Sequence, residues 1–338
     1  MRTPKTPAQF KTMSQKARPY LNGLNLNLIS APVALGQTLE GVDEGPEILV
    51  QNGLALLIED LGWTIKKVSE VDVHDLRWDA PEAKLPAHQT GVNIKFPTEL
   101  GQICKDLGQL TQASSREKSF TLTLGGDHSI AIGSIGGALL ERPNLGVIWV
   151  DAHGDFNTPA TSPSGNIHGM PLSFLTGVMQ TYQLESFSWL KNFLTPDQLV
   201  LVGIRSIDPE ERDLMKSWGV NVFTMSEIDR FGIGEVMEQA KLILLKNGDR
   251  PLHLSYDIDA IDPHFAPSTG TRVRGGLNYR EAHYIAEALS ETGFLVGMDL
   301  VEINPRLGYV DPAHREEKNI TVEIGLELIG SALGKRIY

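Results

Sequence analysis

The sequence has 338 residues, of which 41% are hydrophobic and 21% are charged, and its formal net charge is −12 at pH 7. This composition is ordinary for a globular protein that can bury a sizeable core. No segment approaches the roughly 20 apolar residues that a membrane-spanning helix needs. We therefore expect no membrane as partner. An acidic chain repels phosphate backbones, so we also expect no nucleic acid as partner. The charge is compatible with a small cationic substrate.

The N-terminal segment is basic, and no acidic residue occurs among residues 1–39. Such segments occur in organelle transit peptides, and the alternative is a disordered basic arm. We expect a basic arm over residues 1–23, followed by a single domain over residues 24–338. The expected location is cytoplasmic, with a mitochondrion or another organelle as the alternative.

From residue 24 onward, strand-like apolar segments alternate with amphipathic helix-like segments. The strand candidates cover residues 24–30, 63–71, 120–126, 145–153, 198–206, 220–225, 251–259 and 294–303. Several are nearly continuous apolar runs, which are typical of strands buried on both faces of a parallel sheet. The helix candidates include residues 45–62, 226–246 and 278–293. This alternation predicts a doubly wound α/β sheet of about eight strands.

Two further segments carry structural predictions. Residues 74–93 lack a regular pattern and are predicted to form a surface loop. Cys104 is the only cysteine, so an intramolecular disulfide and a cysteine-cluster zinc site are both excluded. Its apolar neighbours predict a buried helix position, which is usual for a free cysteine.

Acidic and histidine side chains stand at the ends of three strand candidates. The motifs are GGDHS (125–129), DAHGD (151–155) and SYDID (255–259). Alternate residues of a strand share one face, and the functional crevice of an open α/β sheet lies beyond the carboxyl ends of its strands. One aspartate there usually caps a helix or lies in a solvated turn. Five carboxylates and two histidines in one crevice would repel strongly without a cation, so the sequence predicts a metal site.

The chemistry of the candidate ligands indicates which metal would bind. They offer carboxylate oxygen and imidazole nitrogen without thiolate, and a carboxylate-rich set suits manganese. The ligand supply exceeds the needs of one ion, so two ions bridged by carboxylates are expected. Such a pair can lower the pKa of a bridging water enough to give hydroxide near neutral pH.

Together, the three motifs resemble the metal-binding signature of the ureohydrolase family, which includes arginases and agmatinases. The resemblance runs from about residue 30 to residue 330 and includes GPEILV (45–50) and GMDLVEINP (297–305). It implies a three-layer α/β/α sandwich with an eight-stranded parallel sheet, which would form a single catalytic domain. It also implies a homo-oligomer, which in arginases is usually a trimer or a hexamer, and we expect a trimer here.

The resemblance further implies two Mn²⁺ ions per subunit and a set of six ligands. One ion would be held by His128, Asp151, Asp155 and Asp257, and the other by Asp151, His153, Asp257 and Asp259. The neighbouring Asp127 and Asp262 are expected to make structural hydrogen bonds instead.

Guanidinium hydrolysis needs a strong nucleophile, an orienting counter-charge and a proton donor. The expected nucleophile is the metal-bridging hydroxide, and Asp155 is placed among the catalytic residues beside it. Glu302 in DLVEINP resembles the guanidinium-binding acid of the family, since a carboxylate matches the planar donor fork of guanidinium. His168 in SGNIHG resembles the proton shuttle, because histidine titrates near neutrality.

The loop DFNTPATSPSGNIHG (155–169) resembles the arginase loop that binds the α-carboxylate of the substrate. Neutral donors there can bind a carboxylate without adding a permanent charge near the metals. Two acids in IRSIDPEE resemble those that contact the α-ammonium directly or through water. By position, the candidate substrate-binding residues are Asn157, Ser164, Asn166, Asp208, Glu211 and Thr271.

Three residues depart from the family pattern. Ser206 stands where we expect an acidic residue in close arginases, which would weaken support of the amino-group site. Arg272 and Arg274 stand where the family more often has proline and an apolar or acidic residue. These two cations would either repel a cationic substrate at the crevice mouth or point outward.

We therefore predict a binuclear manganese hydrolase that converts L-arginine to L-ornithine and urea. One alternative is an agmatinase or another guanidino-acid ureohydrolase, although the SGNIHG loop argues against agmatinase. A second alternative is a catalytically silent arginase-like protein. The loss of metal ligands would favour this alternative, but no expected ligand is missing from the sequence. A sugar- or nucleotide-binding α/β protein finds no support, because no GxGxxG motif follows a strand candidate.

Overall fold

The computed structural model describes residues 18–73, 93–308 and 319–336. Most of the predicted basic arm and almost all of the predicted loop at 74–93 therefore lie outside the described residues. Within the last part of the predicted arm, Leu21 is buried and the guanidinium of Arg18 lies 5.0 Å from the centre of the Trp63 ring.

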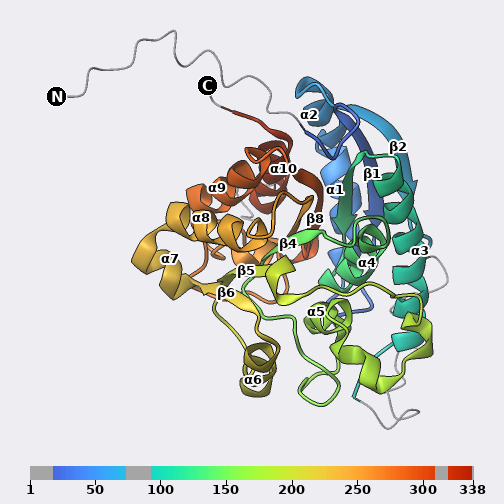
Figure 1. The fold of residues 1–338 in the computed structure, drawn as a ribbon. Helices are drawn as coiled ribbons and strands as arrows, with labels where there is room; N and C mark the ends of the chain where they lie inside the picture. Colours follow the sequence, from blue (N-terminus) through green and yellow to red (C-terminus); the bar gives the residue numbers. More distant parts are fainter. Residues whose placement is uncertain (1–17, 74–92, 309–318, 337–338) are drawn as a thin grey trace.

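The described residues form an eight-stranded sheet in the order β2-β1-β3-β8-β7-β4-β5-β6 (Figure 1). Every neighbouring pair of strands is parallel, so the predicted eight-stranded parallel sheet is confirmed. The strands are β1 (Asn25–Ala31), β2 (Thr64–Glu70), β3 (Phe120–Gly125), β4 (Gly146–Val150), β5 (Leu199–Ile204), β6 (Asn221–Thr224), β7 (Leu252–Asp257) and β8 (Leu295–Val301).

The burial of the strands follows from their place in the sheet. Every residue of the interior strands β3, β4, β5, β7 and β8 is buried, which explains their continuous apolar sequences. The edge strand β2 has no buried residue, and Val68 on it is largely exposed. Parallel strands buried in this way need a helical layer on each face.

Helices cover both faces of the sheet (Figure 1). One group packs together and comprises α1 (Gly45–Gln51), α2 (Leu54–Asp60), α8 (Ile233–Leu244), α9 (Tyr279–Ser290) and α10 (Ile320–Leu333). A second group comprises α3 (Pro97–Arg116), α4 (Ala131–Glu141) and α5 (Pro171–Leu175). The connection from β5 to β6 contains α6 (Pro209–Trp218), and α7 (Met225–Phe231) follows β6.

Two of the predicted helical segments are each divided in two by a glycine. The segment 45–62 forms α1 and α2, and Gly53 between them has a φ of 95°. The segment 226–246 lies in α7 and α8, which Gly232 separates with φ and ψ of 79° and 151°. Only glycine adopts such backbone angles readily, and the helix stops at each of these two positions. The amphipathic pattern of the sequence continues across both glycines, so it predicted one helix where the structure has two.

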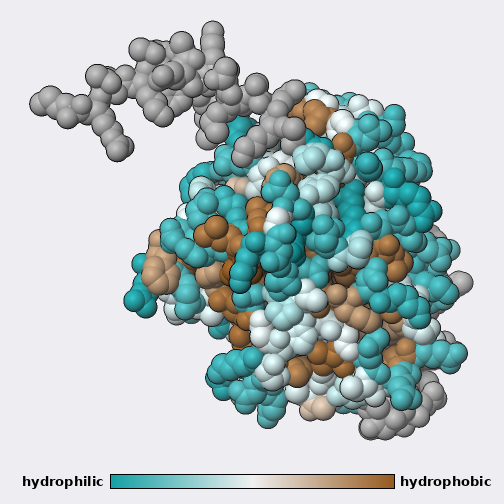
Figure 2. Space-filling view, in the orientation of Figure 1, coloured by the Kyte–Doolittle hydropathy of each residue, from teal (hydrophilic) through white to brown (hydrophobic). Residues whose placement is uncertain are grey.

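The surface carries no concentrated apolar face in the view of Figure 2, where hydrophobic residues form separate patches among hydrophilic ones. The large exposed hydrophobic side chains come from several different elements, among them α2, β2, α7 and α8. In the part of the chain that the structure describes, no helix has the length and apolar character to cross a membrane.

The helices α3 and α4 approach closely because glycines line their contact. A Cβ atom added to Gly137 would lie 2.1 Å from the carbonyl oxygen of Gly108, so no larger residue fits there. Cys104 of α3 is fully buried at this contact, and its Sγ lies 3.5 Å from the carbonyl oxygen of Ser129. The predicted buried helix position of Cys104 is confirmed, and burial raises the pKa of its thiol well above the ordinary value.

Cys104 should therefore be unreactive in the folded protein. Thiolate is the nucleophilic form, and both burial and the raised pKa suppress it. We expect no reaction of Cys104 with Ellman's reagent at pH 8, and one thiol per chain after denaturation in guanidinium. Rapid labelling of the native protein would show that the α3–α4 contact opens readily.

Candidate active site

The order of strands places four sequence motifs side by side. Strands β3, β8, β7 and β4 are consecutive neighbours in the sheet, and all run in the same direction. The segments that follow them therefore meet at one edge. The first or second residue of each segment is acidic: Asp127 after β3, Glu302 after β8, Asp259 after β7 and Asp151 after β4.

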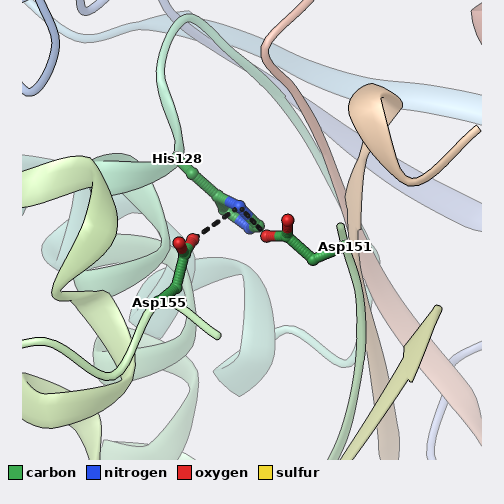
Figure 3. Close-up of side chains that lie close together, drawn as sticks. All are labelled: His128, Asp151 and Asp155. Carbon is green, nitrogen blue, oxygen red and sulfur yellow. Dashed lines mark ion pairs between the residues drawn. The ribbon is translucent and has the colours of Figure 1, made fainter. Parts of the chain in front are cut away.

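The first cluster surrounds the imidazole of His128. Its Nδ1 atom lies 3.1 Å from Asp151 Oδ2, 3.2 Å from Asp155 Oδ2 and 3.2 Å from Asp257 Oδ2. Figure 3 shows the His128 ring between the carboxylates of Asp151 and Asp155. All four side chains are buried.

The second cluster shares Asp151 with the first. His153 Nδ1 lies 3.4 Å from Asp151 Oδ1 and 3.1 Å from Asp259 Oδ2. In each of the sets His128–Asp151–Asp155 and Asp151–His153–Asp259, the potential ligand atoms all lie within 4.8 Å of one another. The structure thus brings all six candidate ligands together in two adjoining groups.

The arrangement of Asp151, His153 and Asp155 differs from the sequence prediction. The predicted strand extended to residue 153, but β4 ends at Val150. Asp155 has a left-handed φ of 50°, and a Cβ added to Gly154 before it would meet the Glu211 carboxylate at 2.8 Å. Beyond this turn, Asp155 lies in the first cluster and His153 in the second, and the two clusters share Asp151.

The first cluster has the properties of a cation site. His128 Nε2 lies 3.0 Å from Ser255 Oγ, which leaves Nδ1 directed at the three carboxylates. Nδ1 is buried and forms no well-oriented hydrogen bond within the described residues. Carboxylate oxygens and imidazole nitrogens form a donor set that suits hard or borderline divalent ions. The residues present therefore fit a metal ion.

Burial and mutual repulsion control the ionisation of this cluster. Burial, with a contribution from Asp151, raises the pKa of Asp155 to about 7. Burial and the neighbouring Asp259 and Asp151 raise the pKa of Asp257 well above its ordinary value. Burial alone would lower the pKa of His128, but its carboxylate partners outweigh this effect and raise it strongly. Without metal, the cluster therefore retains protons where a cation would bind.

Two residues that support the candidate ligands were not identified from the sequence. Trp149 Nε1 donates a hydrogen bond to Asp151 Oδ2 at 3.0 Å, and its ring stacks on His128 with 3.9 Å between centroids. Ser255 contacts His128 Nε2 as described. Trp149 precedes Asp151 by two positions, as Ser255 precedes Asp257, so strand periodicity could have indicated both residues.

The predicted proton shuttle and guanidinium-binding acid contact each other. His168, in the 3₁₀ helix Ile167–Gly169, places Nδ1 3.0 Å from Glu302 Oε1. The same oxygen accepts the backbone N–H of His128 at 3.0 Å. Glu302 is buried and has a φ of 63°, which is uncommon for a residue with a side chain. Burial opposes charge on His168, but Glu302 and Asp155 raise its pKa to about 9.

Asp127 and Asp262, the two acids beside the candidate ligands, make structural hydrogen bonds, as predicted. Asp127 accepts the backbone N–H of Gly36 at 2.7 Å and that of Ser129 at 3.0 Å. Gly36 also accepts the backbone N–H of His168 at 3.1 Å, and a Cβ at Gly36 would lie 2.4 Å from Asp127 Oδ1. Asp262 accepts three backbone N–H groups, two of them from Gly275 and Gly276.

All six candidate substrate-binding residues line one cavity of about 170 Å³. They share it with His153, Asp155, His168 and Asp257. Asn157 Nδ2 donates to Asp208 Oδ2 at 3.1 Å, and Thr271 Oγ1 donates to Asp259 Oδ2 at 2.7 Å. The sheet edge and the loop after β4 therefore enclose a small polar cavity beside both candidate metal groups.

Glu211 is held by the backbone around this cavity. Its two carboxylate oxygens accept the backbone N–H groups of Phe156 at 2.8 Å and Asp208 at 3.2 Å. The second bond is part of a capping box at the start of α6. Burial, opposed by these hydrogen bonds, raises the pKa of Glu211 to about 7.

The three residues that depart from the family pattern lie in different places relative to the cavity. Ser206 lines the cavity and pairs with His153 in an isolated β-bridge. Arg272 donates to the carbonyl oxygens of Thr269 and Leu307. Arg272 and Arg274 are both exposed, and neither side chain lines the cavity.

Comparisons with known proteins agree on one family. A model of the arginase family matches residues 24–334. The human protein named Arginase-1 is 41% identical over 322 residues, which cover 95% of each chain. The crystal structure of arginase from Bacillus cereus superimposes with a TM-score of 0.80 at 36% identity and covers 93% of this chain and 99% of its own. An Entamoeba histolytica arginase in complex with L-ornithine gives a TM-score of 0.79 at 32% identity, over 92% and 99% of the two chains.

Divalent metal should stabilise the protein more strongly as pH rises from 5 to 8. In the metal-free protein, Asp155 and His153 carry raised pKa values, so protons occupy both clusters at low pH and a metal must displace them. At about 100 times its dissociation constant, a ligand adds about 2.7 kcal/mol to the unfolding free energy. Melting temperatures with Mn²⁺ and with EDTA, measured at pH 5.5 and pH 8, give this difference directly.

The matched controls are Asp151→Asn, which removes a carboxylate shared by both clusters, and Asp229→Asn, an exposed carboxylate of α7. The first should abolish the metal-dependent gain and the second should leave it unchanged. Equal gains at both pH values would contradict competition between protons and metal in the clusters.

Proposed function

Because the chain belongs to the arginase family, we propose that it hydrolyses L-arginine to L-ornithine and urea with two Mn²⁺ ions. Its class is that of an arginase-type ureohydrolase. The observation that carries the proposal is the pair of adjoining carboxylate–histidine clusters beside a small polar cavity. The cavity gives a substrate access to the clusters and to the proposed proton donor at once.

The proposed metal ligands are the six side chains of the two clusters. His128, Asp155 and the shared Asp151 belong to the first cluster, and His153 and Asp259 belong to the second. Asp257, whose Oδ2 lies against His128, would complete both sets. Two divalent ions held there would activate water for attack on the guanidinium carbon.

Glu302 is the proposed anchor for the guanidinium group. Its carboxylate is almost fully buried, so an ionised form there needs a cationic partner. A guanidinium ion can satisfy that need with two parallel N–H donors. In the structure His168 takes part of this role, because its imidazole contacts Glu302 Oε1.

His168 is the proposed proton donor to the leaving amino group. With a pKa raised to about 9, its ring is mostly protonated at neutral pH. The imidazole lines the cavity, so a proton at its ring nitrogen can reach a bound substrate. Once Glu302 binds the guanidinium, His168 is released from this partner and can transfer its proton to the departing amine.

The far end of the cavity is proposed to recognise the amino-acid part of the substrate. Asn157, Ser164 and Asn166 offer neutral donors for an α-carboxylate, and they come from one loop. Asp208 is proposed to face the α-ammonium, and Glu211 supports it through the capping box. Polar recognition of this kind discriminates strongly, because a missing substrate group leaves a buried protein group unpaired.

Several features of the wider biology stay predictions from the sequence. They are the homotrimer, the cytoplasmic location with its organelle alternative, and the division into an arm over residues 1–23 and a catalytic domain over residues 24–338. Size-exclusion chromatography with light scattering measures the first of these directly.

The substrate assignment is tested by urea release. We expect the Mn²⁺-reconstituted protein to release urea from L-arginine but not from agmatine, since agmatine lacks the carboxylate. Asp151→Asn should abolish this activity because Asp151 is common to both clusters. Release from agmatine alone would overturn the carboxylate assignment of the loop, and release from neither substrate would overturn the proposed function.

The role of His168 is tested by its pH dependence. We expect His168→Asn to lower kcat on L-arginine by roughly 10²–10⁴-fold, the usual contribution of a general acid. With a pKa of about 9, the donor form is fully present below this pH and is lost as pH rises through it. Because this pKa belongs to the substrate-free enzyme, a wild-type fall in kcat/KM above pH 9 should be absent in the variant. His264→Asn, at an exposed histidine outside the cavity, is the control, and equal losses in both variants would contradict the assignment.

A further inference from the structure

A short segment before α3 supports the loop that forms the outer wall of the cavity. The backbone N–H of Lys95 donates to the carbonyl oxygen of Gly165 at 2.9 Å. The side chain of Asn93 donates to the carbonyl oxygen of Ser162 at 2.7 Å. Gly165 has a left-handed φ of 72°, and a Cβ there would lie 2.6 Å from Asn93 Oδ1. The close approach of the two segments therefore requires a glycine at position 165.

The side chain of Lys95 reaches the cavity-lining residue Asn166. Lys95 Nζ donates a hydrogen bond to Asn166 Oδ1 at 2.8 Å. Lys95 is half-buried, and within the described residues no carboxylate forms an ion pair with its ammonium. The hydrogen bond to Asn166 is thus a specific, charge-assisted contact that fixes the lysine beside the cavity.

This contact determines which end of the Asn166 amide is free. A side-chain amide presents an acceptor oxygen and a donor NH₂ group, and an ammonium has donors only. Because the ammonium of Lys95 takes the Oδ1 end, the Nδ2 end is left to donate elsewhere. A donor at this position suits a carboxylate, whereas an acceptor would repel it.

The charge of Lys95 is also unusual for this region. The cavity is lined by four carboxylic acids, Asp155, Asp208, Glu211 and Asp257, which favour cationic groups. A negatively charged substrate group therefore needs a compensating cation at its own end of the cavity. Lys95 places an ammonium one hydrogen bond beyond Asn166 and belongs to neither of the two clusters.

We propose that Lys95 is a positioning residue that makes the site selective for substrates with an α-carboxylate. It orients the Asn166 amide as a donor and supplies a positive charge behind it. The proposal rests on the proposed function, and it adds a specificity determinant outside the loop 155–169 and outside both clusters.

The test compares Lys95→Met, which removes the charge and the donor, with Lys95→Arg, which keeps both. For Lys95→Met we expect the KM for L-arginine and the Kd of L-ornithine to rise roughly 10- to 100-fold, as for a lost hydrogen bond to a charged group. The kcat should change little, and the Kd of putrescine, which lacks the carboxylate, should not rise. Lys95→Arg should restore most of the affinity for L-ornithine. Calorimetric titration of the Mn²⁺-loaded enzyme gives the dissociation constants.

Lys241→Met is the matched control, because Lys241 is also half-buried and has one polar partner, Glu238, on α8. Melting temperatures of all variants separate a folding defect from a binding defect. If the wild type hydrolyses L-arginine and Lys95→Met keeps its affinity for L-ornithine, or loses affinity for putrescine equally, the role of Lys95 is overturned alone. If the wild type neither hydrolyses L-arginine nor binds L-ornithine, the proposed function and the role of Lys95 are overturned together.

Discussion

Repulsion among buried carboxylates at the carboxyl edge of the sheet is the interaction on which the rest of this structure depends. Asp151, Asp257 and Asp259 are at most 3% exposed, so water cannot screen their charges. In the metal-free chain, the protonated imidazoles of His128 and His153 compensate these negative charges. Under the proposed function, two divalent ions would compensate them instead. Two residues at this edge, Asp155 and Glu302, hold left-handed backbone conformations. Such strain persists only where the surrounding packing fixes the backbone.

The strand order explains how the charges come together. Four adjacent strands, β3, β8, β7 and β4, end beside one another although they are far apart along the chain. Each is buried along its whole length, so the sheet edge is a rigid platform for the side chains that follow. Trp149 and Ser255 extend this rigidity to the ligands themselves, because they contact Asp151 and His128 from within the strands.

Under the proposed function, the residues that recognise the substrate lie apart from this platform. Asn157, Ser164 and Asn166 line the cavity from the loop after β4, which is held by hydrogen bonds to Gly36 and to residues 93–95. Function in α/β proteins is often divided in this way between a fixed sheet and variable loops. The positions of Arg272 and Arg274 fit this division, since neither side chain lines the cavity.

The sequence by itself determined the eight strands, their parallel arrangement and the set of side chains at their ends. These follow from local periodicity, because side-chain alternation and apolar runs are properties of the covalent chain. Only the tertiary structure decided the backbone path that brings Asp155 to the first cluster, since β4 ends at Val150 and Asp155 has a left-handed φ. The contact between Lys95 and Asn166, which are 71 positions apart in the sequence, was likewise decided only by the tertiary structure. Contacts of this kind depend on how distant segments pack, and no local pattern specifies that.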